Sequence, residues 1–498
     1  MLHLIQKNNW IKLGHLEEHI NGLEKLDNIA AEFTPEKVAA ITGIPAETLL
    51  RITKEYVLAE RAVLYGRMGM STQEHGGLCH WLVGVINILT GHFDKEGGAM
   101  FTKSAVDIIR SKKFHAAHGR WKSRVRDLPE FDGELPVSGL AEEMLTPGKG
   151  QVKAFITYAG NPVLSTPNSK RLETALPQLD FMVSIDIYLN ETTRHADIIL
   201  PPPSHLEIEH YDLIFNAISV SNNVKYSQPL FQPAEGQLTD WQIAKELIKR
   251  FAKVAKTKPS PLFQWFTPKT LLNLALLTGP YGKLSSPSKL FSGLSLQKVI
   301  DSKHGISLGA LESRIPAVLR TRDYKINIAD AVFMEGLAKV KDTFKKDAST
   351  PLATNEFLLI GRRHLRSNNS WMHNIPKLMR GKNRCTMMIH PTDAEILQIK
   401  EEQLVTVISA TGSLQIPAEI TDTMMPKVIS IPHGFGHHKK GSRLDVASTA
   451  ENAGVSVNTI TDHNRIDAVT GNAAFSGQKV MIESTISNSN KISNNDSD

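Results

Sequence analysis

One short segment of the chain combines residue types that are suited to binding a phosphate group. Gly361, Arg362 and Arg363 follow a predicted strand. Glycine backbone N–H groups and guanidinium forks at such a position can hold a pyrophosphate. The formal net charge of +6 gives weak support to an anionic ligand, because the Lys and Arg residues are scattered along the chain. The alternative interpretation of this segment is a solvated basic turn.

Two groups of histidine and acidic residues could bind a metal ion, but their spacing argues against it. His205, Glu207 and Glu209 alternate, so a strand would place them on one face, yet no neighbour completes a coordination sphere. His437 and His438 are adjacent, so a strand would point them apart. We therefore expect no metal ligand from these side chains.

Cysteine content and composition narrow the class of protein. Cys79 and Cys385 are too few for a disulfide framework, a zinc site or an iron–sulfur cluster, and we expect a reduced, cytoplasmic protein with Cys79 buried in a helix. Aromatic residues make up 6% and no basic stripe occurs, which disfavours nucleic-acid binding. No segment has the apolar length of a membrane span or the features of a signal peptide, so we expect no membrane association.

The first hundred residues predict helices around one strand. Thr34 can cap a helix that ends at Gly43, and apolar spacing predicts a further helix before residue 60. The run 62–65 predicts a short buried strand followed by a glycine turn, and 78–90 predicts another helix.

The middle of the chain predicts a doubly wound parallel α/β layer. Its predicted elements are the strands 152–158, 181–185 and 197–200, with a helix at 169–176. Because the carboxyl ends of parallel strands meet at one edge, Asn161 and Asp186 should project together. The basic segment 111–133 predicts a surface connection, and 255–345 predicts mixed helices and loops.

The last third of the chain predicts a β-barrel. Its predicted strands are 357–361, 403–409, 414–420 and 427–432. The polar residues 485–498 predict a disordered tail. The resulting domains are 1–98, the remainder of an α/β domain; 99–348, a second α/β domain; and 355–484, the barrel.

Several blocks in this order resemble the molybdopterin oxidoreductase superfamily. They are Gly66–Gly77 with Asn87–Asp94 and Gly97-Gly98, Tyr158–Pro162, Asp186 through Thr192 to Pro201, Thr239–Trp241, Gly361–Leu365, Ile389–Pro391, Pro432–Gly434 and Gly454–Asp462. The resemblance implies an enzyme that carries out two-electron redox chemistry on a small substrate. It also implies a bis-molybdopterin guanine dinucleotide cofactor with molybdenum or tungsten, and a double-psi type of barrel that covers the dinucleotides.

The resemblance also suggests which residues bind the cofactor. The cofactor-binding candidates are Met68, Gln73, Asn161, Asp186, Thr192, Asp240, Gly361, Arg362, Arg363, Asn368 with Asn369, His433, Asn458 and Gln478 or Lys479. Carboxylates such as Asp186 and Asp240 can accept both donors of a guanine edge, although each could instead cap a turn or helix. Arg67 is the one catalytic candidate, since an arginine could orient an anionic or oxo substrate; its alternative is a surface residue.

The chain departs from the family pattern before residue 15. Complete members begin with a cysteine cluster for a [4Fe–4S] centre, followed by a metal-ligand residue, and neither is present. We therefore expect the chain to be inactive alone, with an electron-transfer partner or a missing N-terminal half as its partner. The other hypotheses are a non-catalytic scaffold subunit with this fold and, less favoured, an ordinary nucleotide-binding enzyme, for which no glycine-rich phosphate motif occurs.

Overall fold

A computed structural model describes residues 1–27, 29–107, 117–347 and 351–484, and the chain forms two compact units. The first unit comprises Met1–Tyr65, Trp81–Ala116 and Leu200–Ala338, and the second comprises Gly66–His80, Ala117–Ile199 and Lys339–Asp498. Both units are built from segments that alternate along the chain. The consecutive domains expected from sequence are a different division and stay a prediction.

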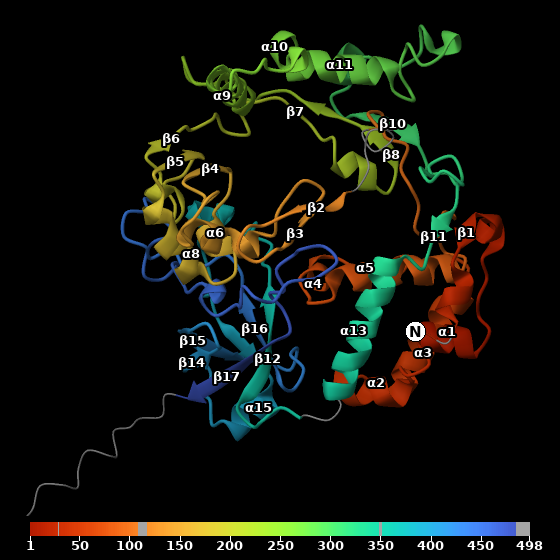
Figure 1. Ribbon diagram of the computed structural model, residues 1–498, viewed down its shortest axis with the longest axis vertical. Helices are drawn as coiled ribbons and strands as arrows, with labels where there is room; N and C mark the ends of the chain where they lie inside the picture. Colours follow the sequence, from red (N-terminus) through yellow and green to blue (C-terminus); the bar gives the residue numbers. More distant parts are fainter. Residues whose placement is uncertain (28, 108–116, 348–350, 485–498) are drawn as a thin grey trace, which may run out of the picture. The chain divides into compact units, whose positions relative to one another are not determined.

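The first unit is mainly helical (Figure 1). Its helices are α1 (Leu2–Lys7), α2 (Pro35–Thr42), α3 (Ala46–Leu58), most of α5 (Gly76–Leu89), α9 (Asp240–Val254), α10 (Pro261–Trp265), α11 (Pro268–Thr278), α12 (Leu296–Asp301) and the start of α13 (Ala331–Asp347). The predicted boundaries of α2 are confirmed, because the Thr34 hydroxyl accepts from the Lys37 amide and Gly43 ends the helix at φ +68°.

Three short strand pairs complete the first unit. They are β1 (Ile20–Asn21) parallel to β11 (Ile326–Asn327), β8 (Asn222–Val224) antiparallel to β10 (Ile306–Gly309), and β7 (His210–Tyr211) antiparallel to β9 (Tyr226–Ser227).

The strand predicted at 62–65 is wrong. This segment belongs to none of the strands of the described residues, and Val63 and Tyr65 are exposed. The Asn87 side chain of α5 takes the place of a neighbouring strand. It accepts from the Leu64 amide at 3.0 Å and donates to the Leu64 carbonyl at 2.9 Å. A single side chain therefore satisfies the backbone groups that a β-ladder would have paired.

The second unit contains the parallel layer expected from sequence. Strand β5 (Phe181–Ile185) lies between β4 (Ala154–Tyr158) and β6 (Ile198–Ile199), and all three are parallel. The crossover from β4 to β5 contains α7 (Pro162–Ser165) and α8 (Ser169–Ala175), and α6 (Leu140–Leu145) packs beside α8 (Figure 1).

The predicted surface connection at 111–133 is partly corrected. Residues 111–116 lie outside the described part of the chain. The remainder forms an antiparallel pair, β2 (His118–Lys122) with β3 (Pro129–Phe131), and β2 is exposed along its length.

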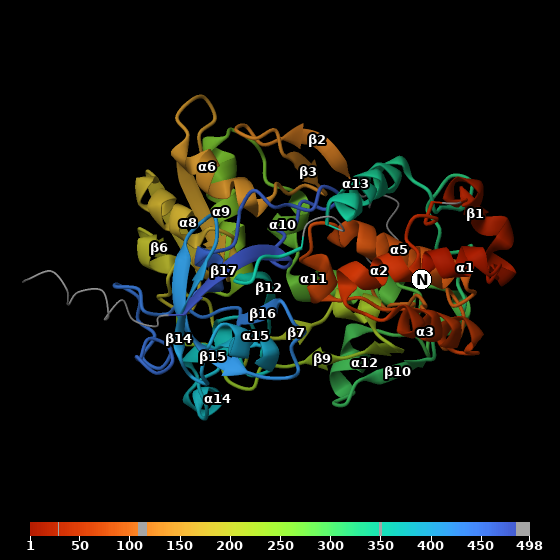
Figure 2. The same cartoon turned by 90° about the horizontal axis from the view of Figure 1, so that it is seen from below.

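The predicted barrel is confirmed as a closed six-stranded barrel of order β12-β16-β13-β15-β14-β17. Figure 2 labels its strands β12, β14, β15, β16 and β17. Its strands are β12 (Glu356–Arg362), β13 (Met387–Ile389), β14 (Leu404–Ile408), β15 (Ser413–Ile420), β16 (Val428–Pro432) and β17 (Gln478–Ser484), with α15 (Pro391–Ile396) after β13. Alternating apolar residues fill the interior, among them Phe357, Leu359, Val405, Val407, Ile429 and Ile431. The sequence-based prediction missed β13 and β17.

The tail predicted to be disordered, 485–498, lies outside the described residues. Within the described part of the chain, none of the helices is both long enough and apolar enough to span a bilayer.

Candidate functional site

The second unit contains a cavity of about 410 Å³, a size typical of small-molecule sites. Its lining residues come from α4 (Met68–Ser71) and the segment after it, from the end of α7, and from the loops of the barrel. They are Met68, Gly69, Thr72, Ser165, Gly361, Arg362, Arg363, Asn369, His433, Val457, Asn458, Thr461, Phe475 and Ser476. Seven predicted cofactor-binding residues are thus brought together: Met68, Gly361, Arg362, Arg363, Asn369, His433 and Asn458.

Strand direction explains why two distant segments meet at this cavity. Strands β12 and β16 are parallel neighbours, with Arg362 paired to Pro432, so their carboxyl ends emerge at one end of the barrel. The next amide, that of His433, donates to the Arg362 carbonyl at 3.0 Å. On another wall, the Ser476 amide donates to the Thr72 carbonyl at 3.1 Å and holds the segment after α4 against the barrel loops.

Arg362 directs its guanidinium group at protein acceptors. Its Nη2 donates to the Thr386 carbonyl and hydroxyl, both at 2.8 Å, and to the Arg384 carbonyl at 3.2 Å. Its Nη1 donates to the Ser430 carbonyl, and burial lowers the pKa of Arg362 despite nearby Glu419. The guanidinium group of Arg362 is therefore occupied by hydrogen bonds within the protein.

Arg363 is the guanidinium of this site that has no protein acceptor. It is exposed, and within the described residues it makes no hydrogen bond or ion pair. Burial, reinforced by the charge of Arg363, lowers the pKa of His433 to about 4. At neutral pH the cavity wall thus presents a cationic fork beside an uncharged imidazole, a donor set that suits a phosphate next to a polar ring.

Two consecutive asparagines form the turn after this arginine. Asn368 and Asn369 have φ values of +40° and +62°, a left-handed conformation that asparagine tolerates better than most residues. Asn369 lines the cavity, whereas the predicted Asn368 does not.

Four predicted amide and hydroxyl ligands have their polar groups paired inside the protein. Asn161 donates to Glu191 at 2.8 Å and accepts from the Thr192 hydroxyl at 2.7 Å. Asn458 donates to the Leu164 carbonyl at 2.7 Å, and Gln478 accepts from the Asp462 amide at 2.8 Å. These bonds fix loop positions. Cofactor contact by Asn161, Thr192 and Gln478, which do not line the cavity, stays a prediction.

The two predicted guanine-binding carboxylates lie outside the cavity lining. Asp186 follows β5, accepts from the Tyr188 amide at 3.0 Å and from the Asn190 side chain at 3.2 Å, and burial raises its pKa. Asp240 is the first residue of α9 in the first unit, directly after the N-cap Thr239. Asp186 satisfies the alternative of a turn cap, whereas Asp240 does not cap its helix, because Thr239 occupies the N-cap position. Guanine recognition stays a prediction for each.

Near α4, Arg67 precedes the helix and is exposed, and it is not part of the cavity lining. Gln73 donates to the Gly69 carbonyl at 3.0 Å and thereby closes the turn beside the cavity. A catalytic role for Arg67 and cofactor contact by Gln73 both stay predictions.

Within the described residues, no group of three or more His, Cys, Asp or Glu side chains could hold a metal ion. Cys79 is only partly buried, and burial raises the pKa of its thiol. Burial likewise raises the pKa of Cys385 to about 11, so both thiols are protonated at neutral pH.

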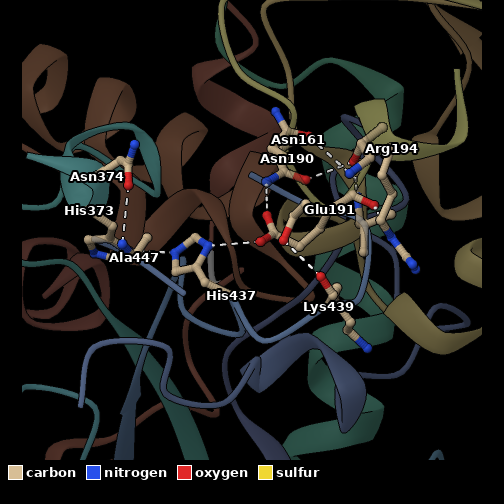
Figure 3. A network of polar contacts seen from close by, with 12 residues as sticks. Asn161, Asn190, Glu191, Arg194, His373, Asn374, His437, Lys439 and Ala447 are labelled. Carbon is tan, nitrogen blue, oxygen red and sulfur yellow. Dashed lines mark hydrogen bonds and ion pairs between the residues drawn. The ribbon is translucent and has the colours of Figure 1, made fainter. Parts of the chain in front are cut away.

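One buried polar network was missed by the sequence-based prediction. The carboxylate of Glu191, the His437 ring and the His373 ring lie in a row (Figure 3). The only available signal was the His437-His438 pair, which was considered for metal binding alone. Its real partners lie 64 and 246 residues away in sequence, so no local pattern could reveal them.

The parallel layer, the closed barrel and the cavity define a class of α/β protein in which a cavity lies at one end of a barrel. Residues 5–250 match the family model described as molybdopterin oxidoreductase, and residues 357–479 match the molydopterin dinucleotide binding domain. The chain belongs to the molybdopterin oxidoreductase family.

Individual relatives agree with this family. The chain is 25% identical over 451 residues to an F420-dependent formate dehydrogenase subunit alpha of Methanocaldococcus jannaschii. The aligned region covers 87% of this chain and 63% of the relative. It is 23% identical over 467 residues to the molybdopterin-containing subunit of a thiosulfate reductase of Salmonella typhimurium, covering 88% and 60%. The chain thus spans less than two thirds of these relatives.

A solved structure shows the same fold. Acetylene hydratase from Pelobacter acetylenicus superposes with a TM-score of 0.72 at 16% identity, covering 97% of this chain and 69% of that one. The family implies a molybdopterin dinucleotide cofactor with molybdenum or tungsten. The cavity fits the dinucleotide part of such a group, because it combines the unpaired Arg363 fork with Gly69 and Gly361, beside which a Cβ would meet open space.

Proposed function

We propose that the cavity at the barrel end binds a phosphate-bearing part of the molybdopterin guanine dinucleotide. The observation that carries this proposal is the Arg363 guanidinium, which lies on the cavity wall without a protein acceptor beside the neutral ring of His433. A cation that is exposed and uncommitted can form charge-assisted hydrogen bonds with phosphate at little cost in lost protein contacts.

The cofactor, when bound, supplies the two-electron redox chemistry of the family. The residues of this chain orient it: Arg363 offsets phosphate charge, and His433 and Asn369 offer neutral hydrogen-bonding groups. The guanidinium of Arg67 makes no hydrogen bond or ion pair among the described residues, so it is available to orient a small anionic or oxo substrate. The relatives named for formate and thiosulfate support a small anion as the substrate class.

Guanosine 5′-diphosphate, a fragment of the dinucleotide, provides a direct test. Titration calorimetry should show binding, with adenosine 5′-diphosphate bound more weakly. Arg363→Met should weaken binding by about tenfold, which corresponds to the loss of about 1.4 kcal/mol. Arg366→Met is the matched control, because Arg366 is exposed in the same loop and does not line the cavity. Absence of binding, or an equal loss in the control, would contradict the proposal.

A scaffold subunit is the second candidate, and the internal pairing of Asn161, Thr192 and Gln478 favours it. Metal analysis of protein from cells that make the cofactor separates the two. One molybdenum or tungsten atom per chain, together with dye-linked activity, indicates a catalyst. The absence of both the metal and the activity indicates a scaffold or a chain that is inactive alone.

Several finer features belong to the same proposal. We propose a doubly wound α/β layer, supported by the parallel order β4-β5-β6, and a double-psi barrel, supported by its closure. A cytoplasmic location is supported by two free cysteines. An electron-transfer partner is proposed because the formate dehydrogenase and thiosulfate reductase relatives are named as subunits.

A further inference from the structure

Three buried side chains of the second unit form a continuous hydrogen-bonded relay, Glu191–His437–His373 (Figure 3). Glu191 Oε1 lies 3.1 Å from His437 Nδ1, and His437 Nε2 lies 2.8 Å from His373 Nδ1. At the far end, Glu191 Oε2 accepts from Asn161 at 2.8 Å. All three relay side chains are at most 1% exposed.

The positions of the hydrogen atoms determine which nitrogen donates and which accepts along the relay. An ionised Glu191 requires the hydrogen of His437 on Nδ1, so in a neutral ring Nε2 must accept from Nδ1–H of His373. His373 Nε2 is buried and makes no hydrogen bond of good geometry among the described residues, although the Gly434 carbonyl raises the pKa of the ring against the larger effect of burial. The His373 ring also packs on Phe435, with ring centroids 4.3 Å apart.

Each member of the relay is joined to a different wall of the cavity. Glu191 holds Asn161, which precedes α7, and α7 ends at the lining residue Ser165. His437 lies four residues after the lining residue His433 in the loop that follows β16. His373 lies in the short helix Trp371–Asn374, four residues after the lining residue Asn369.

The segments that form these walls are closely packed, so a shift of one segment displaces the others. Gly434 lies so near the Asn369 carbonyl that an added Cβ would overlap it, and a Cβ on Gly436 would lie 2.8 Å from that of Ser456. Ser456 precedes the lining residues Val457 and Asn458. A shift of the 433–437 loop would therefore move several lining residues together.

Stability alone is a poor explanation of this arrangement. Desolvation of a buried carboxylate offsets much of what its hydrogen bonds contribute, and an unpaired buried nitrogen is unfavourable. Well-packed apolar side chains would serve stability at least as well.

We propose that Glu191, His437 and His373 are positioning residues of the cavity, which as one hydrogen-bonded chain hold the Ser165, His433 and Asn369 walls in register for the dinucleotide. The inference rests on the proposed function for the identity of the ligand. Its geometric content, the coupling of three walls, concerns this chain alone.

Replacement of His373 separates positioning from stability. His373→Leu cuts the relay while removing the unpaired nitrogen, so the chemical-denaturation midpoint at pH 7 should not fall, yet binding of guanosine 5′-diphosphate should weaken about tenfold. His373→Asn can place its amide nitrogen where Nδ1 lies, so affinity should return to within about threefold of the original. His437→Asn keeps the bond to Glu191 but breaks the link to His373, and should weaken binding about as much as His373→Leu. The control His438→Leu alters the exposed neighbour and should leave affinity unchanged.

Hydrogen–deuterium exchange without ligand tests the coupling independently of the proposed function. His373→Leu or His437→Asn should speed amide exchange in all three segments, 162–166, 368–374 and 433–437. If the unaltered protein binds no guanosine 5′-diphosphate but exchange rises in all three, the ligand assignment fails and the relay stands. If exchange rises only beside the substitution, or if affinity follows the denaturation midpoint across all variants, the relay proposal is overturned.

Discussion

Adjacent residues of one strand end can have opposite roles, as Arg362 and Arg363 show. Successive side chains of a strand point to opposite sides, so one guanidinium meets the Ser430 and Thr386 acceptors while the other reaches the cavity without one. The sequence predicted an Arg pair but could not say which member was free, because that depends on acceptors from β16 and from the segment before β13.

This difference predicts unequal effects on folding. Arg362→Met should lower the free energy of unfolding by about 3 kcal/mol, because buried carbonyls lose their donor, whereas Arg363→Met should change it by less than about 0.5 kcal/mol. Urea denaturation of the two variants measures both values. Equal effects would show that the Arg362 hydrogen bonds contribute little.

The His373 ring predicts a specific pH dependence. Burial, followed by the charge of His437, lowers the pKa of His373 to about 3 from an ordinary 6.5. Between these values the unfolded chain binds a proton that the folded chain does not, so the free energy of unfolding falls as the pH falls. This group should contribute a slope of about 1.4 kcal/mol per pH unit near pH 5.

Substitution isolates that contribution. Between pH 7 and pH 4.5, His373→Leu should lose about 2–3 kcal/mol less stability than the unaltered protein, as measured by urea denaturation at each pH. His438→Leu should keep the original pH dependence. Parallel curves for all three proteins would mean that His373 is protonated as readily when folded as when unfolded.

At the scale of elements, the loop between β16 and the relay depends on Gly434. It has φ +94°, and an added Cβ would overlap the Asn369 carbonyl. Gly236 has a similar φ of +76° but open space around it. Both positions disfavour alanine by about 1 kcal/mol for backbone strain, but only Gly434 adds a steric clash.

We therefore expect Gly434→Ala to lower the free energy of unfolding by about 3 kcal/mol and Gly236→Ala by about 1 kcal/mol. Denaturant titration gives both values, and calorimetry should show weaker nucleotide binding for Gly434→Ala only. A similar loss in the two variants would indicate that the Asn369 loop moves away at little cost.

Prediction of elements succeeded where the pattern was local. Thr34 and Gly43 mark the ends of α2 through their own backbone preferences, and the longer barrel strands show clear apolar alternation. β13 has only three residues, too few for a period to be recognised. The failed strand at 62–65 has an apolar run, but its backbone partner is the Asn87 side chain, which no strand pattern encodes.

On the scale of the whole molecule, the two compact units provide separate probes of stability. Asn87 belongs to the first unit, where it bonds the Leu64 backbone and accepts from the Tyr56 hydroxyl at 2.8 Å. The cavity belongs to the second unit. Since a ligand stabilises only the folded unit that binds it, the two should respond differently in calorimetry.

Asn87→Ala should destabilise the first unit by about 2–3 kcal/mol, because buried backbone groups lose their partners. In differential scanning calorimetry it should lower one transition, whereas guanosine 5′-diphosphate should raise the other. The conservative control is Asn8→Ala, whose side chain makes one bond to the Leu4 carbonyl. A single transition that responds to both changes would mean that the units unfold as one.

Closure of the barrel also constrains how the protein can be made. Strand β17 pairs with both β12 and β14, and its pairing with β12 joins residues more than a hundred positions apart. During synthesis, the edges of β12 and β14 that pair with β17 therefore stay without hydrogen-bond partners until residue 484 has left the ribosome. The nascent barrel is exposed to strand-to-strand association throughout that interval, so the yield of folded protein should depend on chaperones that shield such edges during translation.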